Sequence, residues 1–367
     1  MKDIFQNPTV NQLLNEYLIK TNSEGHGIQM DKVDHITQYE TKYPLTPIQS
    51  WFLNKYGTKL SHFNQSVLLE LNLNSSLKDI RKAFDILQEK NFSLQVIFNE
   101  SNNSNKTTYT QTYQEKPSKI SVTTKKFADS EELEIKINEY ASDMHNNISV
   151  KQNKLISAAL IHHRNKQFLL VVAHHLIIDG VSWRILFDEL FEILNLVVIG
   201  ENSLPSVSPR ISPGIWAKAL KEKINKKIQK SEIDYWTRIC VKKTKPLLPA
   251  IDYSDVYVKD CFKNTFQLNE EFTDLIVGQS NKNLNVQTVE LLLTALNLTL
   301  HSEIGPNGIR IELEGHGREQ LDDLATNART IGWFTSVYPH LLKLSKKENN
   351  LKDAIEKTKN DYRSIPN

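Results

Sequence analysis

The chain has 367 residues, enough for about two domains or lobes with sizeable hydrophobic cores. Its 45 basic and 43 acidic residues leave a net charge of +2, so no excess of positive charge indicates a nucleic-acid or membrane partner. Two cysteines, Cys240 and Cys261, are too few for a disulfide framework or a metal cage and fit a reducing compartment. No apolar run approaches the ~20 residues that span a bilayer, and the N-terminus lacks a signal peptide, so we expect a cytoplasmic protein.

Apolar periodicity and turn residues divide the first part of the chain into short elements. An amphipathic helix is predicted at 9–20, followed by a polar linker at 21–40. Thr46 and Pro47 are predicted to begin the next helix, because proline is tolerated at the first helical position. Further elements are predicted as follows: helices at 76–90 and 131–144, strands at 66–73, 96–98 and 109–113, and a polar turn at 99–105.

The segment 155–194 is the most informative part of the sequence. Residues 155–162 and 167–173 are predicted to form a hairpin, and the apolar run 168–173 is typical of a strand buried on both faces. His174 and His175 follow where that strand should end, and a turn at Asp179-Gly180 comes next. Ser182 is predicted to cap a helix whose apolar residues recur from Trp183 onward. Reactive groups are often placed in such strand-to-helix connections.

The rest of the chain is predicted to form a second lobe. The proline- and serine-rich stretch 205–213 is interpreted as the crossing between lobes. Beyond it we expect these elements: a long charged helix at 215–235, a strand at 262–268, a helix at 272–279, a buried apolar helix at 286–300 and a strand at 309–314. In the last strand Ile309, Ile311 and Leu313 alternate with polar residues that end in Glu314.

The residues alone leave several interpretations of these polar groups open. A histidine beside an apolar strand is more often a hydrogen-bonded core residue than a reactive one, although an imidazole with a pKa of ~6.5 is well suited to proton transfer. By itself Glu314 is better explained as part of a salt-bridged exposed face. A metal site at His162, His163, His174 and His175 is disfavoured, because neighbouring strand residues point in opposite directions. No GxSxG motif supports a serine hydrolase.

Several motifs in order resemble one family. The run HHLIIDG at 174–180 resembles the signature of the condensation superfamily of nonribosomal peptide synthetases, and the SWRIL that follows resembles its epimerization domains in particular. Four further matches lie between residues 45 and 336: LTPIQ at 45–49 with Trp51-Phe52, FNQS at 63–66, EGHGRE at 314–319 and RTIGWFTS at 329–336. The resemblance covers about residues 40–365.

The resemblance implies a fold and a domain organisation. The fold class would be α/β, with two chloramphenicol-acetyltransferase-like lobes forming a V around the site. Residues 41–205 would form the N-terminal lobe and residues 206–367 a partial C-terminal lobe. Residues 1–40 would be the last helix of a carrier domain with its linker, and a simple N-terminal helix is the alternative.

The implied activity is epimerization at Cα of an L-aminoacyl or peptidyl thioester tethered to a peptidyl carrier protein. Inversion at Cα needs a base on one face and an acid on the other, and the resemblance assigns these roles to His175 and Glu314. It implies supporting roles for four residues: His174, Asp179, Gly180 and Arg318. The domain itself would bind no cofactor or metal, because the phosphopantetheine arm belongs to the carrier; neighbouring synthetase modules are the other expected partners.

Two departures from the family weaken the comparison. Gln95 stands where the family has an arginine able to pair with the aspartate of HHxxxDG, so Asp179 needs another partner, such as Arg184 or Arg329. The sequence also stops at Asn367, before the family's glycine-rich stretch and further strands, so the second lobe is expected to be incomplete. An amide-forming condensation domain and an inactive carrier-docking fragment therefore stay as alternatives.

Overall fold

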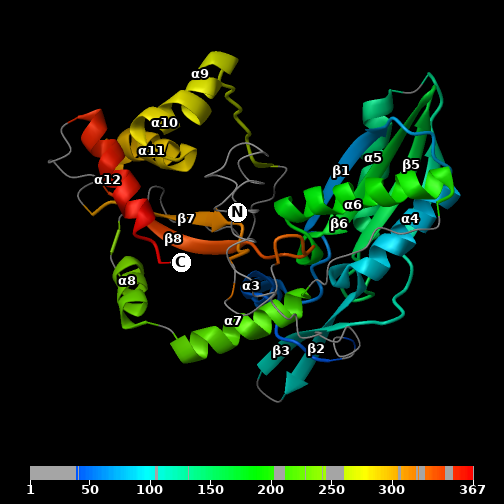
Figure 1. Ribbon diagram of the computed structural model, residues 1–367, viewed down its shortest axis with the longest axis horizontal. Coiled ribbons are helices and arrows are strands. Elements are labelled where there is room, and N and C mark those ends of the chain that lie inside the picture. The colour runs from blue at the N-terminus through cyan, green and yellow to red at the C-terminus, as the bar shows by residue number, and fades with distance from the viewer. Residues whose placement is uncertain are drawn as a thin grey trace, which may run out of the picture.

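The computed structural model describes residues 39–366 apart from these positions: 40, 104–105, 131, 202–210, 228, 242, 245–259, 305–306, 320, 322–326 and 344–349. The helix expected at 9–20, nearly all of the linker at 21–40 and most of the crossing at 205–213 lie outside the described residues. Two α/β lobes lie side by side in Figure 1, each built around its own sheet.

The first lobe contains the elements before the crossing. In chain order they are α3 (Pro47–Tyr56), β1 (Asn64–Leu71), α4 (Leu77–Lys90), η2 (Phe92–Gln95), β2 (Val96–Asn103), β3 (Lys106–Tyr113), β4 (Ser121–Lys126), α5 (Leu133–Asn146), β5 (Ile156–His163), β6 (Lys166–His174), η3 (His175–Ile177) and α6 (Gly180–Ile199). The main sheet has the order β1-β6-β5-β4, so β6 lies between two hydrogen-bonded neighbours.

Alternate residues of β6 bury their side chains in two different cores. Leu169, Val171 and Ala173 pack in the core that α4 and α6 share, whereas Leu170 and Val172 pack with α5 on the opposite face. The predicted buried strand and its hairpin with β5 are therefore confirmed. Because both faces of β6 are buried, its pairing register is fixed, and so is the position of the histidine pair at its end.

Most other predictions for the first lobe are confirmed, with two corrections. Thr46 caps α3 through a capping box with Gln49, as expected for a helix beginning at Thr46-Pro47. The turn predicted at 99–105 is wrong over most of its length, because β2 continues through Asn103 and pairs with β3. Strand β4, which pairs parallel to β5, was not predicted; its sequence SVTTKK is largely polar because it is a sheet edge.

The second lobe is built from the elements after the crossing. They are α7 (Pro213–Lys227), α8 (Lys230–Val241), α9 (Glu270–Asp274), the π-helical turn η5 (Leu275–Gln279), α10 (Ser280–Leu284), α11 (Thr288–Ile304), β7 (Ile309–Gly315), β8 (Ser336–Leu342) and α12 (Leu351–Arg363). Strands β7 and β8 pair antiparallel, and α11 and α12 cover the face of β7 that carries Ile309, Ile311 and Leu313. The predicted strand with its alternation is thus confirmed.

Three predictions for this lobe need correction. The long helix expected at 215–235 is two helices, α7 and α8, which turn away from each other (Figure 1). The strand expected at 262–268 is absent from the described residues there, and Phe262 and Phe266 are 89% and 95% exposed. Helix α11 is buried on one side only: Leu293 packs under β7, but Leu292 is 55% exposed.

Candidate active site between the lobes

His174 is the inward-facing member of the histidine pair that ends β6. Its side chain is fully buried, with the ring edge-on to Phe52 at a centroid distance of 5.6 Å. Its Nδ1 accepts a hydrogen bond from the backbone N–H of Leu176 at 3.1 Å, which holds the short turn η3. Burial lowers the pKa of His174 to about 4, partly opposed by the Leu60 backbone, so the ring is neutral and structural.

His175 points the other way and is only half-buried. Its backbone N–H donates to the carbonyl of Phe63 at 2.9 Å, and its ring contacts two aromatic rings that also contact each other. The centroid of Phe63 is 5.5 Å away and that of Trp333 is 4.4 Å away. Burial lowers the pKa of His175, and nearby backbone groups together with the charges of Asp179 and Glu314 oppose that shift. The neutral imidazole therefore predominates at neutral pH and can accept a proton.

Glu314 approaches the site from the second lobe. It is an exposed residue at the end of β7, opposite Val337 of β8. Its carboxylate is close enough to His175 for its charge to raise the pKa of that imidazole. The two residues assigned as an acid/base pair from the sequence, His175 in η3 and Glu314 in β7, thus lie within electrostatic reach of each other although they are 139 positions apart in the chain.

Asp179 is the N-cap of α6 and one half of a buried ion pair. Its carboxylate accepts from the backbone N–H of Ser182 at 2.8 Å, so the prediction that Ser182 caps the helix is wrong: the helix begins earlier, at Gly180. The reason is that the aspartate side chain reaches the third helical N–H, where a capping oxygen is needed. Gly180 is exposed, and a Cβ added there would meet nothing within 4 Å.

Arg318 supplies the partner that Asp179 was expected to need. Its Nη2 donates to both carboxylate oxygens, at 2.7 and 2.9 Å, and the two side chains are only 1% and 4% exposed. The expectation that Arg184 or Arg329 would pair with Asp179 is therefore replaced by Arg318. Gln95 instead donates to the carbonyls at the end of α4, Gln88 at 2.6 Å and Glu89 at 3.0 Å.

The loop after β7 is shaped to deliver Arg318. Nδ1 of His316 accepts from the backbone N–H of Arg318 at 2.9 Å, the same two-residue turn that His174 makes after β6. Gly317 has φ +62°, and an added Cβ would lie 1.6 Å from the carbonyl oxygen of Phe334. Only glycine fits such a position, because the backbone is left-handed and packed against the backbone of Phe334.

The segment 331–333 belongs to the second half of the sequence but packs in the first lobe, whereas Phe334 packs on Trp216 of α7. Ile331 and Trp333 are buried members of the first lobe's core. The hydroxyl of Ser182 lies 2.8 Å from the carbonyl oxygen of Gly332, and the Phe334 N–H donates to Asp179 at 3.1 Å. The lobes are thus joined beside the site by an ion pair and by backbone hydrogen bonds.

Residues 39–367 match the condensation-domain family. The chain belongs to the condensation-domain family. Tyrocidine synthase 1 of Brevibacillus parabrevis is 30% identical over 375 residues, which take in 100% of this chain and 32% of that protein. Surfactin synthase subunit 1 of Bacillus subtilis (strain 168) is 29% identical over 369 residues, which take in 100% of this chain and 10% of that protein. The chain therefore spans a third or less of these relatives.

Solved structures give the same family and confirm the two-lobed α/β fold expected from the motifs. The epimerization domain from the third module of tyrocidine synthetase B superimposes with a TM-score of 0.79 and 28% identity, covering 90% of this chain and 75% of that one. The first condensation domain of the calcium-dependent antibiotic synthetase gives a TM-score of 0.67 at 15% identity, covering 88% and 73%. The second likeness concerns the fold alone.

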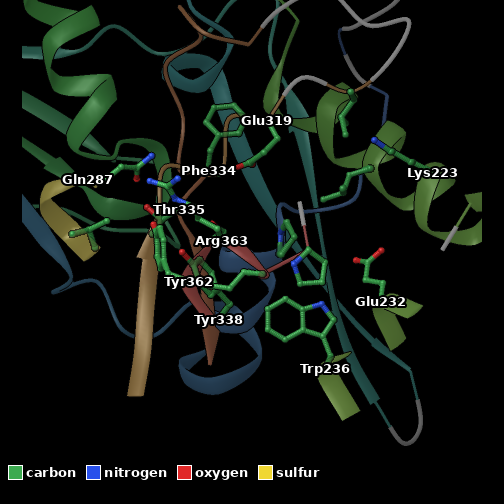
Figure 2. A pocket seen from close by; sticks show the side chains of 18 of the residues that line it. Lys223, Glu232, Trp236, Gln287, Glu319, Phe334, Thr335, Tyr338, Tyr362 and Arg363 are labelled. Carbon is green, nitrogen blue, oxygen red and sulfur yellow. The ribbon is translucent and has the colours of Figure 1, made fainter. Parts of the chain in front are cut away.

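The structure has a large cavity that the residues assigned as the acid/base pair do not line. That cavity, about 1500 Å³, lies on the second lobe, with Lys223, Glu232 and Trp236 on one side and Tyr338 and Arg363 on another (Figure 2). His175 and Glu314 are not among its lining residues. The cavity therefore adds nothing to the assignment of the acid/base pair.

No cluster of three or more histidine, cysteine or carboxylate side chains suited to a metal ion occurs among the described residues. No helix there has the length and apolar character needed to cross a bilayer. The cytoplasmic location stays a prediction.

Sequence reasoning missed the ring contacts of His175. Phe63 and Trp333 both lie in motifs that carried the family resemblance, FNQS and RTIGWFTS, but their contact with the imidazole could not be read from spacing. Ser336, at the start of β8, lines the large cavity.

Proposed function

We propose that this condensation-family domain epimerizes an L-aminoacyl or peptidyl thioester at Cα, with His175 and Glu314 as the acid/base pair. The observation that carries the proposal is that a carboxylate of the second lobe acts electrostatically on the half-buried imidazole of the first. The likeness to a solved epimerization domain, at 28% identity against 15% for a condensation domain, supports the same reaction.

The chemistry requires two proton carriers. One group removes the Cα proton, and the electron pair of that C–H bond moves onto the thioester carbonyl to give an enolate. The other group returns a proton to the opposite face of Cα, and the carbonyl re-forms. The pair suits this exchange when it holds one proton in total, because the protonated partner then acts as the acid while the deprotonated partner acts as the base. Asp179, bound to Arg318, Ser182 and Phe334, holds the loop rather than the proton.

The substrate is proposed to arrive on the phosphopantetheine arm of a peptidyl carrier protein, within a synthetase whose neighbouring modules supply and accept the peptide. The relatives whose names identify them as synthases of tyrocidine, surfactin and bacitracin support this setting. The thioester is needed chemically, because its carbonyl accepts the enolate charge.

Uptake of solvent deuterium at Cα tests the proposal. An L-aminoacyl thioester on a carrier protein is incubated with the chain in D₂O, then released and analysed for label and chirality. Label together with a D/L mixture supports epimerization. No label from the folded chain with a range of carrier-bound aminoacyl thioesters contradicts it.

Amide formation is the second candidate, favoured by the family match itself. Here His175 would assist attack of an acceptor amine on a donor thioester, and Glu314 would not be required. A second carrier loaded with an acceptor amino acid separates the two reactions. A dipeptidyl product that survives Glu314→Gln supports condensation; carrier binding without either product supports a docking role.

A further inference from the structure

The imidazole of His175 is held by rings rather than by a hydrogen-bonded carboxylate. Phe63 stacks on it at an interplanar angle of 27°, and Trp333 lies against it at 35°, with the Phe63 and Trp333 centroids 5.9 Å apart. Phe63 is 37% exposed, whereas Trp333 is only 3% exposed. Trp333 is therefore the more firmly fixed of the two rings.

Asp179 is not available to orient the ring. Its Oδ1 accepts from Ser182 and Arg318, and its Oδ2 accepts from Arg318 and Phe334. Among the described residues no side chain hydrogen-bonds to the His175 imidazole. In a catalytic triad a carboxylate fixes the histidine ring. Here that carboxylate is used in the ion pair, so the aromatic contacts, together with the backbone groups of His175 and Ile178 near the imidazole, must fix the orientation.

Trp333 is anchored on both sides. Its carbonyl accepts from the hydroxyl of Thr46 at 3.0 Å, and Phe52 touches its ring at a centroid distance of 5.9 Å. Two residues earlier, the carbonyl of Ile331 accepts from Ser93 at 2.5 Å. One residue later, the N–H of Phe334 donates to Asp179. The backbone that carries the indole cannot shift without breaking these bonds.

We propose that Trp333 is a positioning residue: the segment 331–333, bound to the first lobe, holds the indole against His175 and thereby sets the direction of the imidazole. The Asp179–Arg318 ion pair then affects the orientation of His175 through this segment, whereas the charge of Asp179 acts on the pKa of the imidazole through space. The inference does not depend on which reaction the site performs, because both epimerization and condensation need a directed imidazole.

The test uses the full chain with histidine labelled by ¹³C and ¹⁵N, and the His175 ring resonances are assigned by their loss in His175→Gln. In the wild-type chain the indole shifts the ring protons of His175 upfield. Trp333→Leu is expected to abolish that shift and to change the His175 pKa, while Trp333→Phe keeps part of both. Trp183→Leu is the matched control, since Trp183 is 9% exposed and bonds Gln65 rather than His175.

Kinetics with a carrier-bound thioester give the second readout. Trp333→Leu is expected to lower kcat about 100-fold with little change in KM, the size of loss that an ångström-scale misplacement causes. If thermal melting shows that Trp333→Leu does not fold, Phe63→Leu removes the other ring in contact with His175 and is expected to have the same effects.

Two results would overturn the proposal: His175 resonances and pKa at wild-type values in the folded variants, or a kcat loss no larger than that of Trp183→Leu. The nuclear magnetic resonance measurement needs no turnover. A chain that performs no exchange would thus count against the proposed function and leave the role of Trp333 to be decided by the ring resonances.

Discussion

Replacement of Arg318 by methionine removes the positive half of the buried ion pair that joins the lobes. The guanidinium donates to Asp179 and to the hydroxyl of Ser182, and its other nitrogen donates to the carbonyl of Thr330 at 2.7 Å. Methionine has a similar length and no charge, so the substitution leaves the Asp179 carboxylate, 4% exposed, without its counter-ion.

The loss of stability in Arg318→Met depends on which hydrogen-bond donors remain around the Asp179 carboxylate. Removing one partner of a buried pair typically destabilises a protein by about 3–5 kcal/mol. Ser182 and Phe334 still donate to Asp179, which favours the lower part of that range, whereas the Thr330 carbonyl loses its donor, which adds to the cost. Adding Asp179→Asn removes the buried charge and keeps an oxygen to cap α6, so the double variant should recover about 2 kcal/mol.

Urea unfolding followed by far-ultraviolet circular dichroism measures these differences. Lys166→Met is the control, because it breaks an exposed ion pair with Glu70, 60% and 45% exposed, of a type that contributes ~0–1 kcal/mol. An Arg318→Met cost as small as that of the control, or no recovery in the double variant, would refute the reasoning.

Two further predictions concern backbone shape and acid stability. Gly317→Ala should destabilise the chain by more than about 1 kcal/mol in urea unfolding, because the left-handed backbone and the Phe334 carbonyl leave no room for Cβ. Gly180→Ala is the control and should be neutral or stabilising, because an added Cβ has no neighbour within 4 Å. Equal effects of the two substitutions on stability would contradict this prediction. Burial lowers the pKa of His174 to about 4 from ~6.5 in the unfolded chain, so unfolding takes up a proton between these values. Stability should be full above pH ~6.5 and fall by about 3 kcal/mol toward pH 4, and His174→Asn should flatten that slope in urea midpoints measured across this range.

The sequence predicted the first lobe better than the second for a physical reason. Strand β6 and helix α6 are dominated by burial, so apolar periodicity alone identifies them. Strand β4 and the outer part of β2 lie at sheet edges or in a solvent-exposed hairpin, where polar residues carry no such signal. In the second lobe, the pattern at 262–268 alternates like a strand, but the residues lie exposed with no strand partner among the described residues.

The site was predicted in its parts but not in its connections. The motifs gave His175 and Glu314, and the described geometry brings them within electrostatic reach. Spacing could not show that Arg318 would reach Asp179, because the two residues are far apart in the chain and meet only when the segment 331–333 packs in the first lobe. For the same reason Arg184 and Arg329 seemed equally good partners from sequence.

The most direct test of the central claim is proton exchange at Cα by His175→Ala and Glu314→Gln, with L- and D-aminoacyl thioesters on a carrier as separate substrates in D₂O. Circular dichroism first confirms that each variant is folded. If the two residues are an acid/base pair on opposite faces of Cα, neither variant converts one enantiomer into the other. Inversion at the wild-type rate by both folded variants would contradict the account.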